Sequence, residues 1–374
     1  MLVRARHYAT GERIDVRHDR GAIVAISAAG RQPADREVGW VAPALFDLQI
    51  NGCKGIAFSS PTITAELVRA VVDECRRHGI GGLLPTLVTN SYEVLAHGFA
   101  TLRQACESDP AVAAAVPGFH LEGPYISPDD GPRGAHAREY VRNPDPEEFR
   151  RLQDAAGGRI RLMTLAPERP GALRFIRELN RAGVVVGIGH SAATPTQIRD
   201  AVAAGGRLST HLGNGSHAVL PRHDNYVWEQ LATDELWASF IPDGHHLPAS
   251  IVKTIVRVKT PGRAIITCDA SSLAGLPPGR YHEWGAELEV QPGGKVVVPG
   301  TPFLAGSGVF TDVCVANAIR MAGVSLRDAI DMAGARPREL LGLPRIELAI
   351  GGPGPLMLFD WEPGGELVVR EVLA

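Results

Sequence analysis

Two histidines directly follow short apolar segments, at positions that suit chemistry better than packing. Residues 184–189 (VVVGIG) precede His190, and residues 207–210 (RLST) precede His211. An imidazole adds little to a buried strand, whereas it is a common ligand of divalent metals. The repeated pattern therefore indicates a metal site at the ends of strands.

Other polar residues close similar apolar runs along the chain. Eight such runs cover residues 41–50, 81–89, 114–123, 160–168, 184–191, 208–214, 238–244 and 264–270. Besides the two histidines, the polar residues at their ends are Asp47, Gln49, Asn51, His120, Glu122, Asp243, His245, His246 and Asp269. Burial without partners would cost each of these groups about 1–3 kcal/mol, so we expect them to share one role.

The runs alternate with segments of helical periodicity, which predicts an α/β fold. Helices are expected at 64–79, 195–206, 307–323 and 325–334. Eight strand–helix units are typical of a TIM-like (β/α)8 barrel, whose active site lies at the carboxyl ends of the strands. The polar run ends would then meet at one mouth.

The two ends of the chain carry alternating β patterns instead. We expect residues 1–42 and 345–374 to form a small β-sandwich domain from both termini, and 43–344 to form the barrel. A β-hairpin insertion is expected near 279–298, and His282 within it has no evident role.

Composition excludes several classes of function. The 374 residues carry a formal net charge of −3, which gives no reason to expect nucleic acid or an anionic membrane as a partner. We see no apolar run near the roughly 20 residues of a membrane span and no signal-peptide core at the start. The five cysteines form no CxxC pair. We therefore expect a soluble cytoplasmic protein.

The spacing of the run ends also predicts the metal chemistry. Glu122, His190 and His211 form a set of two histidines and one glutamate. Zinc accepts three such ligands, keeps a position for water, and lowers the pKa of that water to about 7. Asp269, at the end of the eighth run, is placed to take the proton and pass it to a leaving group.

Several motifs occur in an order that resembles a known family. They are FDLQINGC (46–53), HLEGPYIS (120–127), GAH (134–136), GHSAAT (189–194), THLGN (210–214), DGHH (243–246), CDA (268–270) and LAGS (304–307). As a set they resemble the N-acetylglucosamine-6-phosphate deacetylase family of the amidohydrolase superfamily. The resemblance implies removal of the acetyl group from an N-acetyl amino sugar, with N-acetylglucosamine 6-phosphate as the expected substrate.

The resemblance also implies residue roles, one divalent metal and a homodimer. The metal is expected to be Zn²⁺, with Fe²⁺, Co²⁺ or Mn²⁺ as alternatives. The implied metal ligands are Glu122, His190 and His211, and Asp269 is the implied catalytic acid and base. The implied substrate contacts are His136 near the acetamido group, Asn214 and the backbone of Gly215 at the sugar phosphate, His246, and Leu304 in a pocket-lining loop.

Two departures from the pattern matter. Gln49 and Asn51 stand where most amidohydrolases carry His-x-His, and amides bind divalent metals more weakly than imidazoles, so no second metal is expected. These amides are instead expected to hydrogen-bond near the metal. The loop after His211 is also unusual, and Arg222 is its only candidate for the phosphate-binding arginine that the family often takes from a neighbouring subunit.

Several alternatives stay open at this point. The substrate could be a different or unphosphorylated N-acetyl-hexosamine, or the chain could be another amide hydrolase, a non-catalytic sugar-binding relative, or a barrel with a structural metal. Asn214 also suits a turn beside Gly215, and Asp269 could cap a helix. The basic cluster of His217, Arg222 and His223 could bind an anion, contact a subunit or face solvent.

Overall fold

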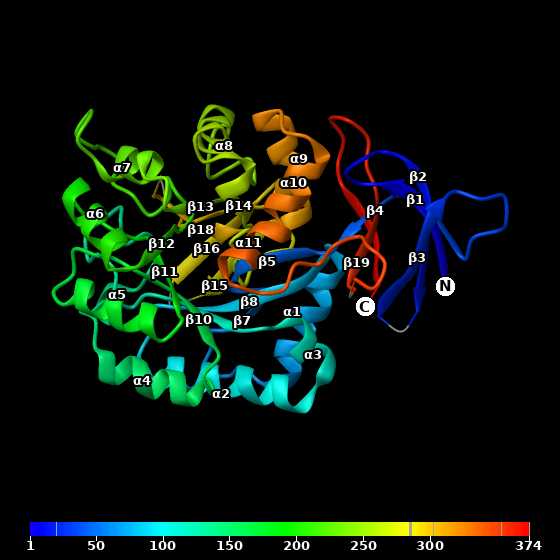
Figure 1. The fold of residues 1–374 in the computed structure, drawn as a ribbon. Helices are drawn as coiled ribbons and strands as arrows, with labels where there is room; N and C mark the ends of the chain where they lie inside the picture. Colours follow the sequence, from blue (N-terminus) through cyan, green and yellow to red (C-terminus); the bar gives the residue numbers. More distant parts are fainter. Residues whose placement is uncertain (20, 284–285, 302, 353, 374) are drawn as a thin grey trace.

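A parallel eight-stranded barrel forms the body of the molecule (Figure 1). The computed structural model describes residues 1–374 except 20, 284–285, 302, 353 and 374. In sheet order the barrel strands are β5 (Leu45–Ile50), β8 (Ile80–Val88), β9 (Phe119–Glu122), β10 (Ile160–Leu165), β11 (Val185–Ile188), β12 (Gly206–Ser209), β13 (Trp237–Phe240) and β14 (Ala264–Ile266). Each of the eight predicted runs overlaps one of these strands, so the predicted barrel is confirmed.

The barrel interior is packed rather than open. Leu84, Leu162, Leu208 and Ile265 belong to one buried cluster and come from β8, β10, β12 and β14. Four side chains from alternate strands make one interior layer of a TIM barrel. The residues that follow in these strands therefore lie nearer the mouth.

The barrel closes between its first and last strands beyond the regular ladder. A parallel bridge joins Ile50 to Ala270, and the backbone N–H of Asn51 donates to the carbonyl of Ala270 at 2.9 Å. Below this bridge, the buried carboxylate of Asp47 accepts the backbone N–H groups of Gln49 and Cys268, both at 2.9 Å.

Helices cover the outside of the barrel, as expected from the periodicity. They are α1 (Ala65–Arg77), α2 (Tyr92–Ser108), α3 (Pro110–Ala115), α4 (Pro146–Ala155), α5 (Ala172–Arg181), α6 (Pro195–Ala204), α7 (Tyr226–Ala232), α8 (Ala249–Arg263), α9 (Thr311–Ala322), α10 (Leu326–Met332) and α11 (Ala335–Leu340). A short 3₁₀ helix, η1 (Arg138–Tyr140), lies in the loop after β9. In α6, Thr194 and Gln197 form a capping box and Pro195 occupies the first turn, which fixes where the helix starts. None of the described helices is long and apolar enough to cross a membrane.

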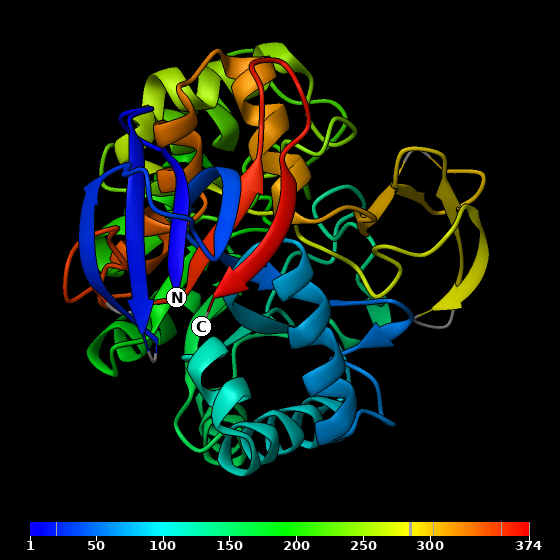
Figure 2. The same ribbon diagram turned by 90° about the vertical axis from the view of Figure 1, so that its right-hand side faces the viewer.

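Strands from both ends of the chain form a separate six-stranded sheet. In sheet order these are β20 (Val368–Leu373), β19 (Leu356–Asp360), β4 (Arg36–Pro43), β1 (Leu2–His7), β2 (Arg13–Asp19) and β3 (Ala22–Ala28). The expected β structure built from both termini is confirmed, here as a single six-stranded sheet in which β4 pairs with β19, with Pro43 opposite Leu356. Figure 2 shows both termini at this sheet.

A smaller antiparallel sheet follows β14 and stands to one side of the barrel in Figure 2. Its strands are β15 (Gly279–Glu283), β16 (Ala286–Gln291), β17 (Lys295–Val297) and β18 (Leu304–Ser307), and a two-stranded ribbon, β6 (Gly52–Cys53) with β7 (Ile56–Ala57), follows β5. A parallel bridge between Ser307 and Ala270 joins the inserted sheet to the end of the barrel.

Candidate metal centre and active site

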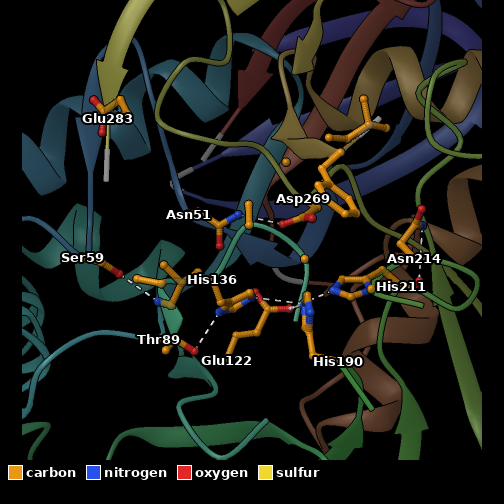
Figure 3. Close-up of a pocket in the computed structure, with 18 of the residues that line it drawn as sticks. Asn51, Ser59, Thr89, Glu122, His136, His190, His211, Asn214, Asp269 and Glu283 are labelled. Carbon is orange, nitrogen blue, oxygen red and sulfur yellow. Dashed lines mark hydrogen bonds and ion pairs between the residues drawn. The ribbon is translucent and has the colours of Figure 1, made fainter. Parts of the chain in front are cut away.

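Glu122, the last residue of β9, lies at the centre of a buried polar cluster (Figure 3). Its Oε1 lies 2.9 Å from Nε2 of His211 and 3.3 Å from Nε2 of His190. The two histidines come two residues after the ends of β12 and β11. The structure thus brings together the three residues that the sequence nominated as ligands.

His136 joins this cluster from the loop after β9. Its Nε2 lies 3.2 Å from Nε2 of His190, and its Nδ1 lies 2.7 Å from Oγ1 of Thr89. The ligand atoms of Glu122, His136 and His190 all lie within 4.8 Å of one another, which makes them a possible metal-binding triad.

The backbone is strained at three of the candidate site residues. His190, His211 and Asp269 have φ values of 51°, 32° and 51°, in the left-handed region that non-glycine residues avoid. Such strain costs on the order of 1–3 kcal/mol for each residue and persists only when its surroundings enforce it. Here Nδ1 of His190 hydrogen-bonds the carbonyl of Pro132 at 2.8 Å, and the amide of His211 donates to Oγ of Ser239 at 2.8 Å.

The side-chain amides of Gln49 and Asn51 donate hydrogen bonds to the carboxylates of the site, and Gln49 bridges the two. Nε2 of Gln49 donates to Oε1 of Glu122 and to Oδ1 of Asp269, both at 2.9 Å. Nδ2 of Asn51 donates to the same Oδ1 of Asp269 at 2.7 Å. Both amides therefore form the hydrogen bonds expected of them within this cluster, and together they hold one carboxylate oxygen of Asp269.

Burial and charge shift the pKa values of these groups in different directions. Burial, helped by the nearby charge of Glu122, raises the pKa of Asp269 to about 6. Burial alone would raise the pKa of Glu122, but hydrogen bonds to His190 and His211 outweigh it and hold that pKa well below its usual range. Burial also lowers the pKa of His136 to about 3, so this imidazole is neutral at pH 7.

His120 lies just below the cluster and is already satisfied by neighbours. Its ring nitrogens lie 3.2 Å from Oγ1 of Thr86 and 2.9 Å from Oγ1 of Thr164. Burial lowers its pKa to about 4, and we assign it a structural role.

The cluster suits a divalent cation on its donor chemistry. Two imidazole nitrogens and a carboxylate oxygen lie within 4.8 Å of one another, and two histidines with one glutamate are a donor set of catalytic zinc sites. Oε1 of Gln49, Oδ1 of Asn51 and Nδ1 of His211 are buried without a hydrogen-bond partner among the described residues. Buried polar atoms of this kind mark a place where a further ligand or water belongs.

A cavity of about 820 Å³ opens above the cluster. Among the residues with an implied substrate role, it is lined by His136, Asn214, Gly215, His246 and Leu304. Nδ1 of His246 is held by Asp243 at 2.7 Å, which leaves its Nε2 for another partner.

Arg222 does not line this cavity in the single chain. It is exposed, and its carbonyl accepts a hydrogen bond from the Trp228 indole at 3.2 Å. In the same loop, His217 hydrogen-bonds the Tyr226 hydroxyl. Within one chain, His217 of this basic cluster is therefore held by a hydrogen bond, whereas Arg222 is exposed.

The inserted sheet forms one side of the cavity, which the sequence did not predict. His282, which had no evident role, lines the cavity together with Glu283 and Lys295. His245 lines it as well and hydrogen-bonds the carbonyl of Gly293 at 2.9 Å. The strand pattern of the insertion was visible in the sequence, but the face it turns to the cavity was not.

Comparisons with known proteins agree with this geometry. The profile of the Amidohydrolase family matches residues 40–363. N-acetylgalactosamine-6-phosphate deacetylase of Escherichia coli O157:H7 is 33% identical over 326 residues, which is 86% of this chain and 84% of that protein. Human N-acetylglucosamine-6-phosphate deacetylase is 34% identical, over 86% of this chain and 79% of that protein.

Solved structures resemble the chain over its full length. One is an aspartate-to-alanine mutant of N-acetyl-D-glucosamine-6-phosphate deacetylase from Mycobacterium smegmatis, in complex with N-acetyl-D-glucosamine-6-phosphate. It is 31% identical, with a TM-score of 0.87 and coverage of 99% of each chain. The protein from Thermotoga maritima gives a TM-score of 0.83 at 25% identity, covering 99% of this chain and 100% of that one. The chain therefore belongs to the amidohydrolase family and, within it, to the N-acetylglucosamine-6-phosphate and N-acetylgalactosamine-6-phosphate deacetylases.

Proposed function

We propose that the protein removes the acetyl group from an N-acetylhexosamine 6-phosphate, giving the hexosamine 6-phosphate and acetate. The observation that carries this proposal is the cluster of Glu122, His136, His190 and His211 beside Asp269, at the mouth of a barrel that belongs to this family. N-acetylglucosamine 6-phosphate is the first candidate substrate. N-acetylgalactosamine 6-phosphate is the second, because a relative of 33% identity carries that name.

The chain's own groups can hold one divalent cation. We assign Glu122, His190 and His211 as its ligands, because both histidine Nε2 atoms converge on Oε1 of Glu122. His136 is assigned to the acetamido group, since it comes from a loop and is anchored by Thr89. Zn²⁺ fits these ligands, and Fe²⁺, Co²⁺ and Mn²⁺ are the alternatives.

Metal analysis of two variants tests this assignment. His211→Gln should lose the metal, whereas His136→Gln should keep it and lose activity. Retention of metal by the first variant and its loss from the second would instead support Glu122, His136 and His190 as the ligands.

Asp269 is the proposed acid and base. When bound, the cation supplies Lewis acidity, which stabilises charge on a carbonyl oxygen and lowers the pKa of water. Gln49 and Asn51 hold Oδ1 of Asp269, while its Oδ2 makes no hydrogen bond to a described residue. Asp269 takes a proton from water as the new C–O bond forms, and delivers it to nitrogen as the C–N bond breaks. His136 orients the acetyl oxygen.

The sugar and its phosphate are proposed to lie along the rest of the cavity. Asn214, the Gly215 backbone, His246 and Leu304 line it and are assigned to the substrate. Arg222 is assigned to the phosphate of a neighbouring active site in a homodimer, because it lies outside the cavity of its own chain. Val219 and Trp228 of the same loop are 87% and 53% exposed, which suits a surface covered by a second copy. The five free, buried cysteines fit a cytoplasmic setting.

One activity panel tests the function. Acetate release is measured from the two N-acetylhexosamine 6-phosphates, their unphosphorylated counterparts, a cyclic amide and an N-acyl dipeptide. We expect the phosphorylated sugars to be hydrolysed preferentially. The ratio of the two rates of acetate release then identifies the hexose that the enzyme prefers. Turnover of the cyclic amide or dipeptide alone would assign the chain to another amidohydrolase activity. No turnover of any compound by metal-loaded protein would favour a sugar-binding relative.

A further inference from the structure

Lys295 is the only lysine or arginine among the described residues that line the cavity. The chain carries 38 lysines and arginines in all, so a single one at the cavity is a small share of them. The other basic side chains that line the cavity are histidines, a residue type whose charge depends on pH near neutrality. Lys295 is therefore the permanent positive charge that a single chain offers to a ligand in this cavity.

The strand register places Lys295 close to the reacting groups. Lys295 lies opposite Ser307 in the pairing of β17 with β18, and Ser307 is bridged to Ala270, the residue after Asp269. Two steps between neighbouring strands put the Cα of Lys295 about 10 Å from that of Ala270. The four-methylene side chain of lysine can cover much of this span.

A second contact ties the same strand to the substrate side of the cavity. The turn before β17 is held by the hydrogen bond between Nε2 of His245 and the carbonyl of Gly293. His245 precedes His246, which is assigned to the substrate. Figure 3 shows Glu283, on the same inserted sheet, across the cavity from His190. A ligand with its acetamido group at the proposed metal ligands would therefore extend toward this sheet.

The ammonium of Lys295 has no partner among the described residues, although the residue is only partly exposed. By contrast, Lys54 forms an ion pair with Glu74, and Nζ of Lys259 donates to the carbonyl of Thr233. An ammonium without a counter-charge is free to form a charge-assisted hydrogen bond with an anion that a ligand brings into the cavity.

We propose that Lys295 binds the phosphate group of the hexosamine 6-phosphate, from within the same chain. This inference rests on the proposed function for the identity of the ligand, and it makes Lys295 a determinant of specificity for phosphorylated sugars. It is separate from the contribution of Arg222, which needs a second subunit. The inserted sheet then serves as the part of the fold that selects the phosphate.

The test compares Lys295→Met with wild type on N-acetylglucosamine 6-phosphate and on free N-acetylglucosamine. A lost charge-assisted hydrogen bond should raise KM for the phosphorylated sugar by about 10- to 100-fold, with kcat little changed. Activity on the free sugar should not change, and Lys295→Arg should recover part of the loss. Lys253→Met is the matched control, because Lys253 is exposed on α8 and does not line the cavity.

An unchanged preference for phosphate in Lys295→Met would overturn the inference. An equal loss on both sugars would overturn it too, since that result indicates a structural role, and Lys295→Gln gives a second variant if the first does not fold. Binding of glucose 6-phosphate, which has no amide to hydrolyse, separates this inference from the proposed function. If wild type binds it at least tenfold more tightly than Lys295→Met but deacetylates no sugar phosphate, the phosphate contact stands and the proposed reaction fails.

Discussion

Replacing Asp269 with asparagine tests the proposed chemistry most directly. The substitution keeps the shape of the side chain and leaves an oxygen to accept the hydrogen bonds from Gln49 and Asn51. The fold and the arrangement of Glu122, His190 and His211 should therefore survive. What is lost is the ability to take a proton from water and return it to nitrogen.

The expected size of the effect follows from that single loss. General acid–base catalysis contributes about 10²- to 10⁴-fold, so kcat should fall by about that factor, which raises the activation barrier by about 3–5 kcal/mol. Because substrate contacts are untouched, KM should change little. The measurement is acetate release under saturating N-acetylhexosamine 6-phosphate, with metal content determined on the same preparation.

Asp312→Asn provides the matched control. Asp312 is also a buried carboxylate, but it pairs with His78 at 2.8 Å and does not line the cavity. The control should keep wild-type kcat. If Asp269→Asn retains kcat within tenfold of wild type while holding its metal, the acid–base assignment is wrong. If it loses its metal, Asp269 belongs to the ligand set instead.

Three further predictions follow from the same geometry. Glu122→Gln should reduce bound metal at least tenfold on metal analysis, because it removes the carboxylate on which His190 and His211 converge; full metal occupancy would contradict the proposed site. Asp47→Ala should lower the free energy of unfolding by about 2–6 kcal/mol in denaturant titration, because it leaves two buried backbone N–H groups without an acceptor, at about 1–3 kcal/mol each. A loss below about 1 kcal/mol would show that the closure between the first and last barrel strands does not depend on this carboxylate. Asp269 must be ionised to accept a proton, and its pKa is raised to about 6, so kcat/KM should fall tenfold per pH unit below that value. A bound cation would move the start of this fall to a somewhat lower pH. If the same fall at low pH persists in Asp269→Asn, it belongs to another group.

The sequence predicted those parts of the fold that local patterns specify. Each barrel strand is a short apolar run, and Glu122, His190 and His211 stand at or just beyond strand ends, where a barrel brings residues together. A residue's position relative to a strand end is visible in the sequence because it depends only on neighbours. The positive φ values of His190, His211 and Asp269 cannot be predicted from the sequence, because tertiary contacts enforce them, such as the hydrogen bond between His190 and the carbonyl of Pro132.

Local sequence patterns could not predict which residues of the loops and of the insertion reach the cavity. His136 lies 14 residues beyond the end of β9, and nothing in its neighbourhood predicts that its ring will meet that of His190. Only the resemblance to a family gave it a role near the substrate. His282 and Lys295 became visible as cavity residues only once the inserted sheet was joined to Ala270 through Ser307.

The sheet built from both chain ends has a consequence for synthesis. Strand β4 gains its partner β19 only after the ribosome has added about 310 more residues, which takes about 15–60 s at ordinary elongation rates. Throughout that interval, β4 presents an open edge to other nascent chains. The barrel strands emerge meanwhile, so the four N-terminal strands of this sheet lack their two C-terminal partners until the whole barrel has been synthesised. A chaperone that shields this edge during synthesis should therefore raise the yield of folded protein.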